Sequence, residues 1–428
     1  MIKNRSALSG ETVATTQSAP DGRTALRPDA PARRSRPQRA DVVVIGAGVA
    51  GLVAAVILAR RGVDTLVLEC ASRARVESRP RAGLLGPGAV DVLERNGLAD
   101  GLRAEGAPHH NCEFRHRRQA FIVEYARHAG GRHHVVYPQQ KLVAGLVAAY
   151  LASGGVIEFD ATDVTLDALT SDHPTVSFVA ADGQRRTVES RFIAGCDGHH
   201  GVSRRSIPEG ALRNTRQHGS PWAWLAVLAA VAPSTDKIIY GISPRGFAGH
   251  MLRDHRTSRF YLQVEAATDA ADWPSERIWE ELHTRLAVDA DWKLAEGPLL
   301  EPPNVITMDS LFYEPMRFGR LLLAGDASRR VPPAAAKGAG LAIADGETLA
   351  LAVAAALHNS DERPLDAYSE ACQARAWLAQ EASTKLLQMV NVELSDSFAR
   401  RLQDVRLDRL RTSPVAAAEF AEQYLSPV

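Results

Sequence analysis

The stretch Asp41–Gly51 (DVVVIGAGVAG) decides the fold of this chain. After Asp41, the next four residues (VVVI) are all apolar and do not alternate with polar residues. This pattern is typical of a strand that is covered on both faces of a parallel sheet. Three glycines follow at the spacing GxGxxG, namely Gly46, Gly48 and Gly51. In a dinucleotide-binding turn the first glycine permits the tight bend, the second lets a pyrophosphate approach the backbone, and the third lets helix and strand pack closely. The stretch therefore predicts such a turn.

The residues after the turn complete a βαβ unit. Residues 52–61 (LVAAVILARR) predict a helix that Gly62 ends, and residues 63–69 (VDTLVLE) predict a second strand that ends in Glu69. The helix N-terminus offers unpaired N–H groups and a positive dipole end, which favour phosphate. An acid about 20 residues beyond the glycines is placed to bind a ribose hydroxyl.

The remaining pattern predicts an α/β protein in which a Rossmann-like nucleotide-binding domain is interleaved with a β-rich substrate domain. Residues 220–264 are rich in strand-forming runs, helices are expected over 140–151 and 274–287, and the chain from about residue 339 is mostly helical. The expected parts are a disordered extension at 1–40, the nucleotide-binding domain at 41–110, 137–216 and 310–360, the substrate domain at 111–136 and 217–309, and a helical C-terminal region at 361–428.

Composition excludes several classes of function. The formal net charge is zero, which gives no reason to expect nucleic-acid or membrane binding, and no apolar run reaches the ~18 residues that span a bilayer. The four cysteines are far apart and form no CxxC pair, so neither a metal site nor a disulfide framework is expected, and a cytoplasmic location fits. The basic segment Arg33–Arg39 is interpreted as part of a solvated tail, with a nucleic-acid or targeting arm as the alternative.

Two further motifs separate FAD from NAD as the bound nucleotide. Cys196-Asp197-Gly198 follows the apolar run RFIAG, and Gly325-Asp326-Ala327 follows RLLLA. The aromatic-hydroxylase class of flavoproteins has a DG and a GD motif in this order after its glycine turn, and the chain resembles that class. The resemblance implies that Asp326 binds the ribityl or ribose region of FAD and that Asp197 and Gly198 serve both FAD and a nicotinamide cofactor.

Within that class the sequence resembles the 4-hydroxybenzoate 3-monooxygenase family from Asp41 to Tyr424. The specific stretches are 193–204 (IAGCDGHHGVSR), 240–248 (YGISPRGFA) and 325–338 (GDASRRVPPAAAKG). In that family NAD(P)H reduces the flavin, and the reduced flavin reacts with O2 to give a C4a-hydroperoxide that hydroxylates the ring of an aromatic acid. The resemblance also implies a homodimer.

Cofactor contacts follow from the same resemblance. Arg79, Arg81 and Gln139 match residues that contact the flavin or its phosphates, and His200 matches a residue of the nicotinamide site. Elsewhere that site departs from the family, because Cys70, Arg75 and Asp309 replace an arginine, a tyrosine and an arginine. Arg75 could bind a 2′-phosphate and Asp309 would repel one, so the choice between NADH and NADPH stays open.

Catalytic residues also match one by one. A neutral phenol is a poor nucleophile, and with a pKa of ~10 it needs help to lose its proton. Tyr240 matches the tyrosine that contacts the substrate phenol, Tyr424 the tyrosine that receives the proton, and His109 the histidine that links the relay to solvent. Pro333 matches a proline whose carbonyl contacts the reacting ring.

The expected substrate pocket matches the family only in part. Arg253 matches the arginine that pairs with the substrate carboxylate, where a planar fork suits bidentate contact. Tyr261 matches its neighbour, and Arg259 matches an arginine that links the substrate domain to the flavin. Met251 replaces a carboxylate-binding serine, and a thioether has no donor. This replacement, together with Ala334 and Gly340 in place of a threonine and an asparagine, favours a related acid such as 3-amino-4-hydroxybenzoate, hydroxylated at C2, as an alternative to 4-hydroxybenzoate.

Two competing functions remain at this stage. Trp222-Ala223-Trp224 is similar to part of the WxWxIP motif of flavin-dependent halogenases, although Leu225-Ala226 does not continue it. A flavin-binding protein without turnover is the other alternative. The catalytic residues that match the family argue against it, whereas the serine and the two arginines that this chain lacks argue weakly for it.

Overall fold

A computed structural model describes residues 38–426, except 82, 218–219 and 394. Residues 37–428 form one compact unit. Most of the expected disordered extension lies outside the described residues. Its last part does not, because the strand β1 (Gln38–Arg39) pairs with a strand of the body three residues ahead of the start expected at Asp41.

A six-stranded sheet forms the nucleotide-binding part, in the order β21-β22-β13-β2-β3-β9. The strands from β22 to β9 are parallel, and β21 is an antiparallel edge. The bounds are β2 (Val42–Ile45), β3 (Thr65–Leu68), β9 (Val156–Glu158), β13 (Phe192–Gly195), β21 (Arg317–Phe318) and β22 (Leu321–Leu323). The α/β class with a Rossmann-like FAD-binding domain is therefore confirmed.

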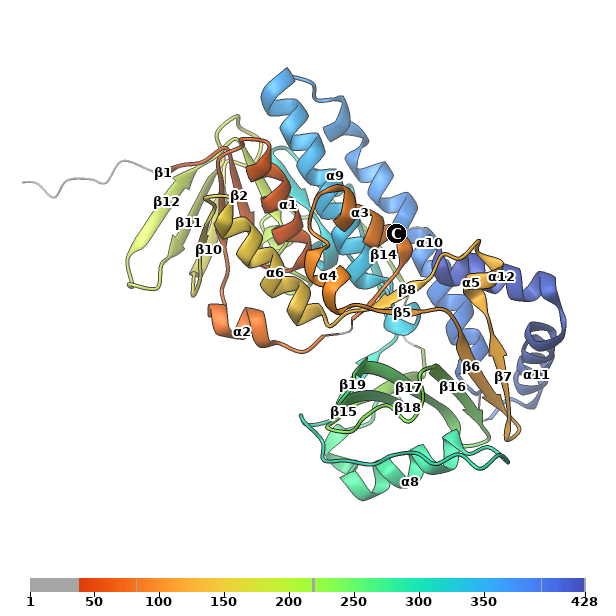
Figure 1. Ribbon diagram of the computed structural model, residues 1–428. Coiled ribbons are helices and arrows are strands. Elements are labelled where there is room, and N and C mark those ends of the chain that lie inside the picture. Colours follow the sequence, from red (N-terminus) through yellow and green to blue (C-terminus); the bar gives the residue numbers. More distant parts are fainter. Residues whose placement is uncertain (1–37, 82, 218–219, 394, 427–428) are drawn as a thin grey trace, which may run out of the picture. The chain divides into compact units, whose positions relative to one another are not determined.

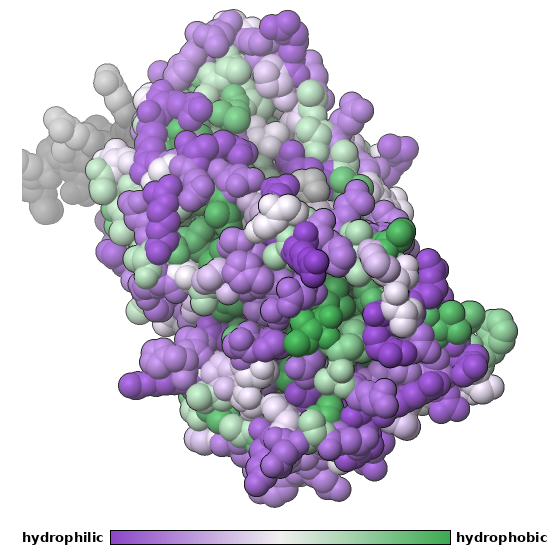
Figure 2. All heavy atoms as spheres, turned by 45° about the vertical axis from the view of Figure 1, so that its right-hand side comes forward, coloured by the Kyte–Doolittle hydropathy of each residue, from purple (hydrophilic) through white to green (hydrophobic). Residues whose placement is uncertain are grey.

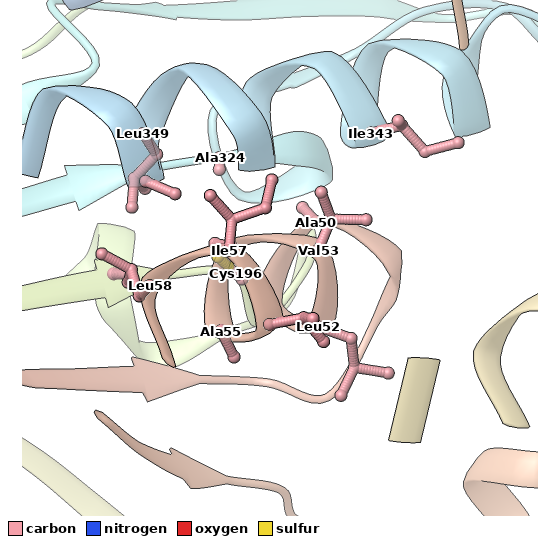
Figure 3. Close-up of a cluster of buried hydrophobic side chains, with 14 of the residues drawn as sticks. Ala50, Leu52, Val53, Ala55, Ile57, Leu58, Cys196, Ala324, Ile343 and Leu349 are labelled. Carbon is pink, nitrogen blue, oxygen red and sulfur yellow. The ribbon is translucent and has the colours of Figure 1, made fainter. Parts of the chain in front are cut away.

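Helices α1 (Val49–Arg60) and α9 (Gly338–Asn359) pack against each other beside this sheet, and α6 (Gln139–Ala152) also contacts α1 (Figure 1). Figure 3 shows Ile57 of α1 pointing toward α9, which carries Leu349. Burial of each such aliphatic side chain contributes about 1.5–3 kcal/mol. Helix α9 is apolar and long enough to cross a membrane, but 72% of its apolar window is buried in the protein, so its composition is that of a core helix.

A seven-stranded sheet forms the substrate-facing part, in the order β19-β15-β18-β17-β16-β6-β7. Side chains alternate between its two faces along each strand. On one face Ala248 and Phe260 pack with α8 (Ser275–Leu286), and on the other Tyr240 and Phe247 pack toward the C-terminal helices. The bounds are β6 (Cys112–His116), β7 (Gln119–Val123), β15 (Trp222–Ala229), β16 (Ile238–Ser243), β17 (Gly246–Asp254), β18 (Thr257–Glu265) and β19 (Asn304–Thr307).

Three smaller sheets complete the strands of the described residues. They contain β1, β10 (Thr162–Asp167), β11 (Thr175–Val179) and β12 (Arg185–Glu189); β14 (Arg213–Gln217), β20 (Ser310–Glu314) and β23 (Arg329–Arg330); and β4 (Leu84–Leu85), β5 (Ala107–His109) and β8 (His134–Val136). The segment 111–136 is thus divided, because β6 and β7 join the seven-stranded sheet whereas β8 pairs with β4 and β5.

The remaining helices are mostly short, apart from the C-terminal group. They are α2 (Arg73–Ser78), α3 (Pro87–Arg95), α4 (Asp100–Glu105), α5 (Tyr125–His128), α7 (Val202–Arg205), α10 (Arg363–Val390), α11 (Ser397–Thr412), α12 (Pro414–Leu425), and the 3-10 turns η1 (Ala270–Asp272), η2 (Gly325–Ala327) and η3 (Pro333–Ala335). Figure 2 turns the side with the C-terminal helices forward and shows a mostly hydrophilic face with a few apolar groups of side chains.

Candidate active site

Of the three glycines in the turn between β2 and α1, only Gly48 borders open space. Gly46 has φ +103°, and a Cβ there would lie 2.6 Å from the carbonyl oxygen of Cys196. A Cβ on Gly51 would collide with the carbonyl oxygen of Gly46, whereas a Cβ on Gly48 would meet nothing within 4 Å. Gly48 is also the N-cap of α1, and no side chain caps the helix. The first N–H groups of α1 therefore face a cradle that fits a pyrophosphate.

Glu69 lies at the carboxyl end of β3 beside this cradle. Its two carboxylate oxygens accept hydrogen bonds from the backbone N–H groups of Ala47 (2.7 Å) and Ala71 (2.9 Å). The Cys70 thiol also donates to the oxygen that Ala71 contacts. The carboxylate is therefore held in place, and the oxygen that Ala47 contacts retains a lone pair for a ribose hydroxyl.

Four charged side chains interact electrostatically beside the cradle, namely Arg79, Arg81, Glu69 and Asp326. Burial lowers the pKa of Arg81, as does the neighbouring Arg79, while Asp326 and Glu69 raise it. Desolvation raises the pKa of Asp326, and Arg81 opposes that effect, although the carboxylate keeps an exposed surface. Both arginines are also exposed. The structure thus brings these predicted FAD residues together around accessible space, as a bound dinucleotide requires.

The DG motif lies at the end of β13. One oxygen of Asp197 accepts hydrogen bonds from the N–H and hydroxyl groups of Ser203 (2.8 and 2.9 Å), and the other oxygen is buried without a hydrogen-bond partner among the residues that the structure describes. Desolvation chiefly raises the pKa of this carboxyl. Gly198 has φ +76°, and His200 is exposed. An unpartnered buried carboxylate oxygen fits a hydroxyl donor of a bound nucleotide.

Two buried phenols meet between the seven-stranded sheet and helix α12. The hydroxyl groups of Tyr240 on β16 and Tyr424 on α12 are 2.9 Å apart, and the two side chains are at most 3% exposed. Burial raises the pKa of both phenols above the ordinary value of 10. Both tyrosines are therefore neutral at physiological pH, and the predicted first and second relay residues are in direct hydrogen-bond contact.

His109 lies near this pair but bonds to other groups. Its Nε2 accepts the backbone N–H of Ile238 (3.2 Å), so its proton is on Nδ1, which donates to the hydroxyl of Tyr125 (2.7 Å). The Tyr125 hydroxyl in turn donates to the carbonyl oxygen of His109. Burial lowers the pKa of His109 to about 4. Among the described residues no hydrogen bond joins His109 to Tyr424.

The sequence did not single out Tyr125 and His134. His134 Nδ1 is 3.3 Å from the Tyr125 hydroxyl, and the rings of both residues pack against the ring of Tyr424. Both side chains are at most 1% exposed, and burial lowers the pKa of His134. Tyr125 begins the short helix α5 and His134 begins the strand β8, and no local sequence pattern distinguishes either residue.

Arg253 of β17 is buried, with 6% of its surface exposed, and it has no carboxylate partner among the described residues. Its guanidinium donates one hydrogen bond, to the side-chain oxygen of Gln140 (2.8 Å). Arg259, which was expected to link the sheet to the flavin, pairs with Glu301 (3.1 Å). Met251 is half-buried in the same cluster as Tyr240.

The turn η3 lies against this cluster. Pro333 is exposed, whereas Ala334 and Ala335 pack with the phenol pair. The buried ammonium of Lys337, a residue that the sequence did not suggest, donates to the carbonyl oxygen of Tyr424 (2.7 Å), and desolvation lowers its pKa to about 7. Tyr261 lies on β18 opposite Gly249 of β17, and Gln139 begins α6.

A nucleotide cradle joined to a sheet with buried phenols is the arrangement of a flavoprotein hydroxylase. A family model described as FAD binding domain matches residues 39–383. The chain belongs to the family of FAD-dependent aromatic hydroxylases, and it is an enzyme with FAD as its cofactor. The family and the enzyme class expected from the sequence are thereby confirmed.

Among characterised relatives, the chain is 35% identical over 385 residues to p-hydroxybenzoate hydroxylase of Acinetobacter baylyi, which covers 90% of this chain and 94% of that protein. It is 28% identical over 361 residues to aklavinone 12-hydroxylase DnrF of Streptomyces peucetius, which covers 77% of this chain and 70% of that protein. By their names, these relatives are hydroxylases of p-hydroxybenzoate and of aklavinone.

Solved structures agree in fold. The crystal structure of p-nitrophenol 4-monooxygenase PnpA from Pseudomonas putida DLL-E4 matches with a TM-score of 0.78 at 20% identity and covers 91% of this chain and 99% of that one. A ternary complex of aklavinone-11 hydroxylase with FAD and aklavinone matches with a TM-score of 0.70 at 22% identity, over 83% of this chain and 70% of that one.

Proposed function

We propose that this protein uses NAD(P)H and O2 to hydroxylate the ring of a hydroxybenzoate-like aromatic acid. The relative with 35% identity, p-hydroxybenzoate hydroxylase, supports this substrate class because its alignment covers nearly the full length of both chains. Bound FAD supplies the oxygen-transfer chemistry. The protein supplies a site that binds the acid, orients its ring and manages the phenol proton.

The observation that carries the proposal is the buried guanidinium of Arg253. A buried charge is costly unless an opposite charge or several hydrogen bonds compensate for it. Within the described part of the chain, the Arg253 guanidinium donates one hydrogen bond, to an uncharged amide, out of five N–H donors in total. The carboxylate of a benzoate would satisfy its remaining donors in a bidentate pair.

The phenol pair supports activation of a hydroxylated ring. Burial raises the pKa of Tyr240 and Tyr424, so both are neutral phenols that can relay a proton. The substrate hydroxyl can donate to Tyr240 while Tyr240 donates its own proton to Tyr424, and Tyr424 in turn releases its proton onward, so that the substrate loses one net proton and the charge remains on the ring that must act as the nucleophile.

We propose two candidates for the particular acid. 4-Hydroxybenzoate fits Arg253 and the phenol pair. 3-Amino-4-hydroxybenzoate is the alternative, because Met251 replaces a carboxylate-binding serine of the family and changes the shape of the pocket, and an amino group activates its ortho position. The indoles of Trp222 and Trp224 donate to Glu393 and Asn391, so both tryptophans of the motif that is similar to the halogenase motif have structural hydrogen bonds.

One ion pair bears on the choice of nicotinamide cosubstrate. Asp309 is paired with Arg330, whose guanidinium donates to its carboxylate at 2.8 Å. The pair lowers the repulsion that Asp309 alone would exert on a 2′-phosphate. We keep both NADH and NADPH as candidates, and we also propose a homodimer in the cytoplasm, where the four cysteines would stay free thiols as they are in the structure.

A product-mass assay tests the proposal. The purified FAD-loaded protein is incubated with NADH, NADPH and air, separately with 4-hydroxybenzoate, 3-amino-4-hydroxybenzoate, 4-aminobenzoate and 3-hydroxybenzoate. We expect one acid to gain one oxygen atom with matching nucleotide oxidation. Peroxide as the sole product with every acid would contradict the proposed substrate class.

A further inference from the structure

The first turn of helix α6 reaches the buried guanidinium of Arg253. Gln140 is the second residue of α6, and its side-chain oxygen accepts a hydrogen bond from Nη2 of Arg253 at 2.8 Å. The two residues lie 113 positions apart in the sequence, one on the nucleotide-binding part and one on strand β17. This contact joins the two parts at the expected carboxylate site.

The chemistry of the pair fixes the orientation of the Gln140 amide. A guanidinium has only donors, so the amide must turn its oxygen to Arg253. The amide NH2 group is then left as a pure donor next to the guanidinium. Two adjacent groups that only donate hydrogen bonds form a site for an anion, and an arginine with a neutral amide beside it keeps its full positive charge.

Two further features favour an anion at this place. Helix α6 has 14 residues and no side-chain cap at Pro138, and Gln140 lies in its first turn, at the positive end of the helix dipole. Met251, two residues before Arg253 on β17, has no donor to offer. A carboxylate held by Arg253 would therefore need its second donor from elsewhere, and Gln140 is already in contact with the guanidinium.

We infer that Gln140 is a second carboxylate-binding residue, which donates its amide N–H to the substrate carboxylate while its oxygen orients Arg253. The assignment rests on the proposed function, since it needs an aromatic acid as substrate. It makes Gln140 a specificity-determining residue: it favours a carboxylate over a neutral ring substituent. No bond is made or broken by this residue.

The test compares Gln140→Leu and Gln140→Met with the wild-type holoenzyme. The dissociation constant is measured from the change in flavin absorbance on titration with 4-hydroxybenzoate, with 3-amino-4-hydroxybenzoate, and with 4-methylphenol as a probe that has no carboxylate. Loss of a hydrogen bond to a charged group predicts binding of the acids that is weaker by roughly tenfold or more. Binding of 4-methylphenol should change less than twofold.

The control is Gln184→Leu, which removes an exposed glutamine in the turn between β11 and β12. Each variant is first checked for its FAD content and thermal midpoint, and Gln140→Met provides a second shape if Gln140→Leu does not fold. Unchanged binding of the acids to both Gln140 variants would overturn the assignment, and so would an equal loss for 4-methylphenol. If the wild type itself bound and hydroxylated none of the acids, the proposed function would fail instead, so the two failures are distinguishable.

Discussion

Replacement of Tyr240 by phenylalanine isolates the role of one buried hydroxyl. The substitution removes the oxygen that lies 2.9 Å from the Tyr424 hydroxyl and leaves the ring in its stack with Phe114. A buried hydroxyl without a partner costs about 1–3 kcal/mol, so the folded state should lose stability by no more than that amount. The ring packing is retained, and we expect FAD to remain bound.

The effect on the reaction should be much larger than the effect on stability. Positioned proton transfer contributes roughly 10²–10⁴-fold to rate, and without Tyr240 the substrate phenol has no path to Tyr424. Flavin reduction by NAD(P)H should stay within a few-fold of wild type, because Tyr240 lies in the substrate sheet and not in the nucleotide cradle. Oxygen consumption should therefore end in H2O2 rather than in hydroxylated acid.

The assay measures nucleotide oxidised, peroxide released and product formed in the same reaction. Tyr150→Phe is the matched control, because it removes another buried phenol hydroxyl, which donates to the carbonyl of Thr65 in the nucleotide-binding part. We expect coupling to fall only in Tyr240→Phe. Wild-type coupling in Tyr240→Phe would refute the relay, and equal uncoupling in both variants would show that any buried hydroxyl loss has this effect.

Three further predictions follow from the site. Arg253→Ala should raise KM for the acid at least tenfold with little change in flavin reduction, as steady-state kinetics would show, and an unchanged KM would remove carboxylate recognition from this residue. Gly46→Ala should yield protein depleted in FAD, measured by its absorbance, because the backbone has φ +103° and a Cβ meets Cys196; full FAD content would contradict that reading. Burial lowers the pKa of Lys337 to about 7, from 10.5 in the unfolded chain. Between these two pH values the unfolded state binds more protons than the folded state, so the free energy of unfolding should rise with pH, by up to about 1.4 kcal/mol per pH unit. Lys337→Met should lack this rise in urea unfolding from pH 7 to 9, and parallel curves for the two proteins would refute it.

The nucleotide-binding part could be predicted from local sequence because its signals are local. A continuous apolar strand, three spaced glycines and an acid at the next strand end lie within Asp41–Glu69, and each has a steric or electrostatic reason that needs no distant partner. The observed β2, α1 and β3 agree with that expectation to within about three residues. Their packing with α9, almost 300 residues later, could not be read from the same stretch.

The substrate part was less predictable because its contacts join distant segments. Tyr240 and Tyr424 were matched by resemblance, and the structure places their hydroxyl groups together across 184 positions. The same resemblance did not foresee that His109 is bonded to Tyr125, or that Arg259 is paired with Glu301. A buried hydrogen bond between remote side chains leaves no periodicity in the sequence, so these partners become visible only when the chain is folded.

The two faces of the seven-stranded sheet pack against different cores, and this restricts how the enzyme can evolve to accept new substrates. Along β17, Ala248 and His250 face α8 and its core, while Phe247 and Met251 face the phenols. Deletion of a single residue within the strand would exchange the two sets, because alternate side chains point to opposite faces. Divergence toward other aromatic acids should therefore proceed by point substitution within β16–β18 and by length changes only in the connecting loops, so the strand lengths of related hydroxylases should be more uniform than their pocket residues.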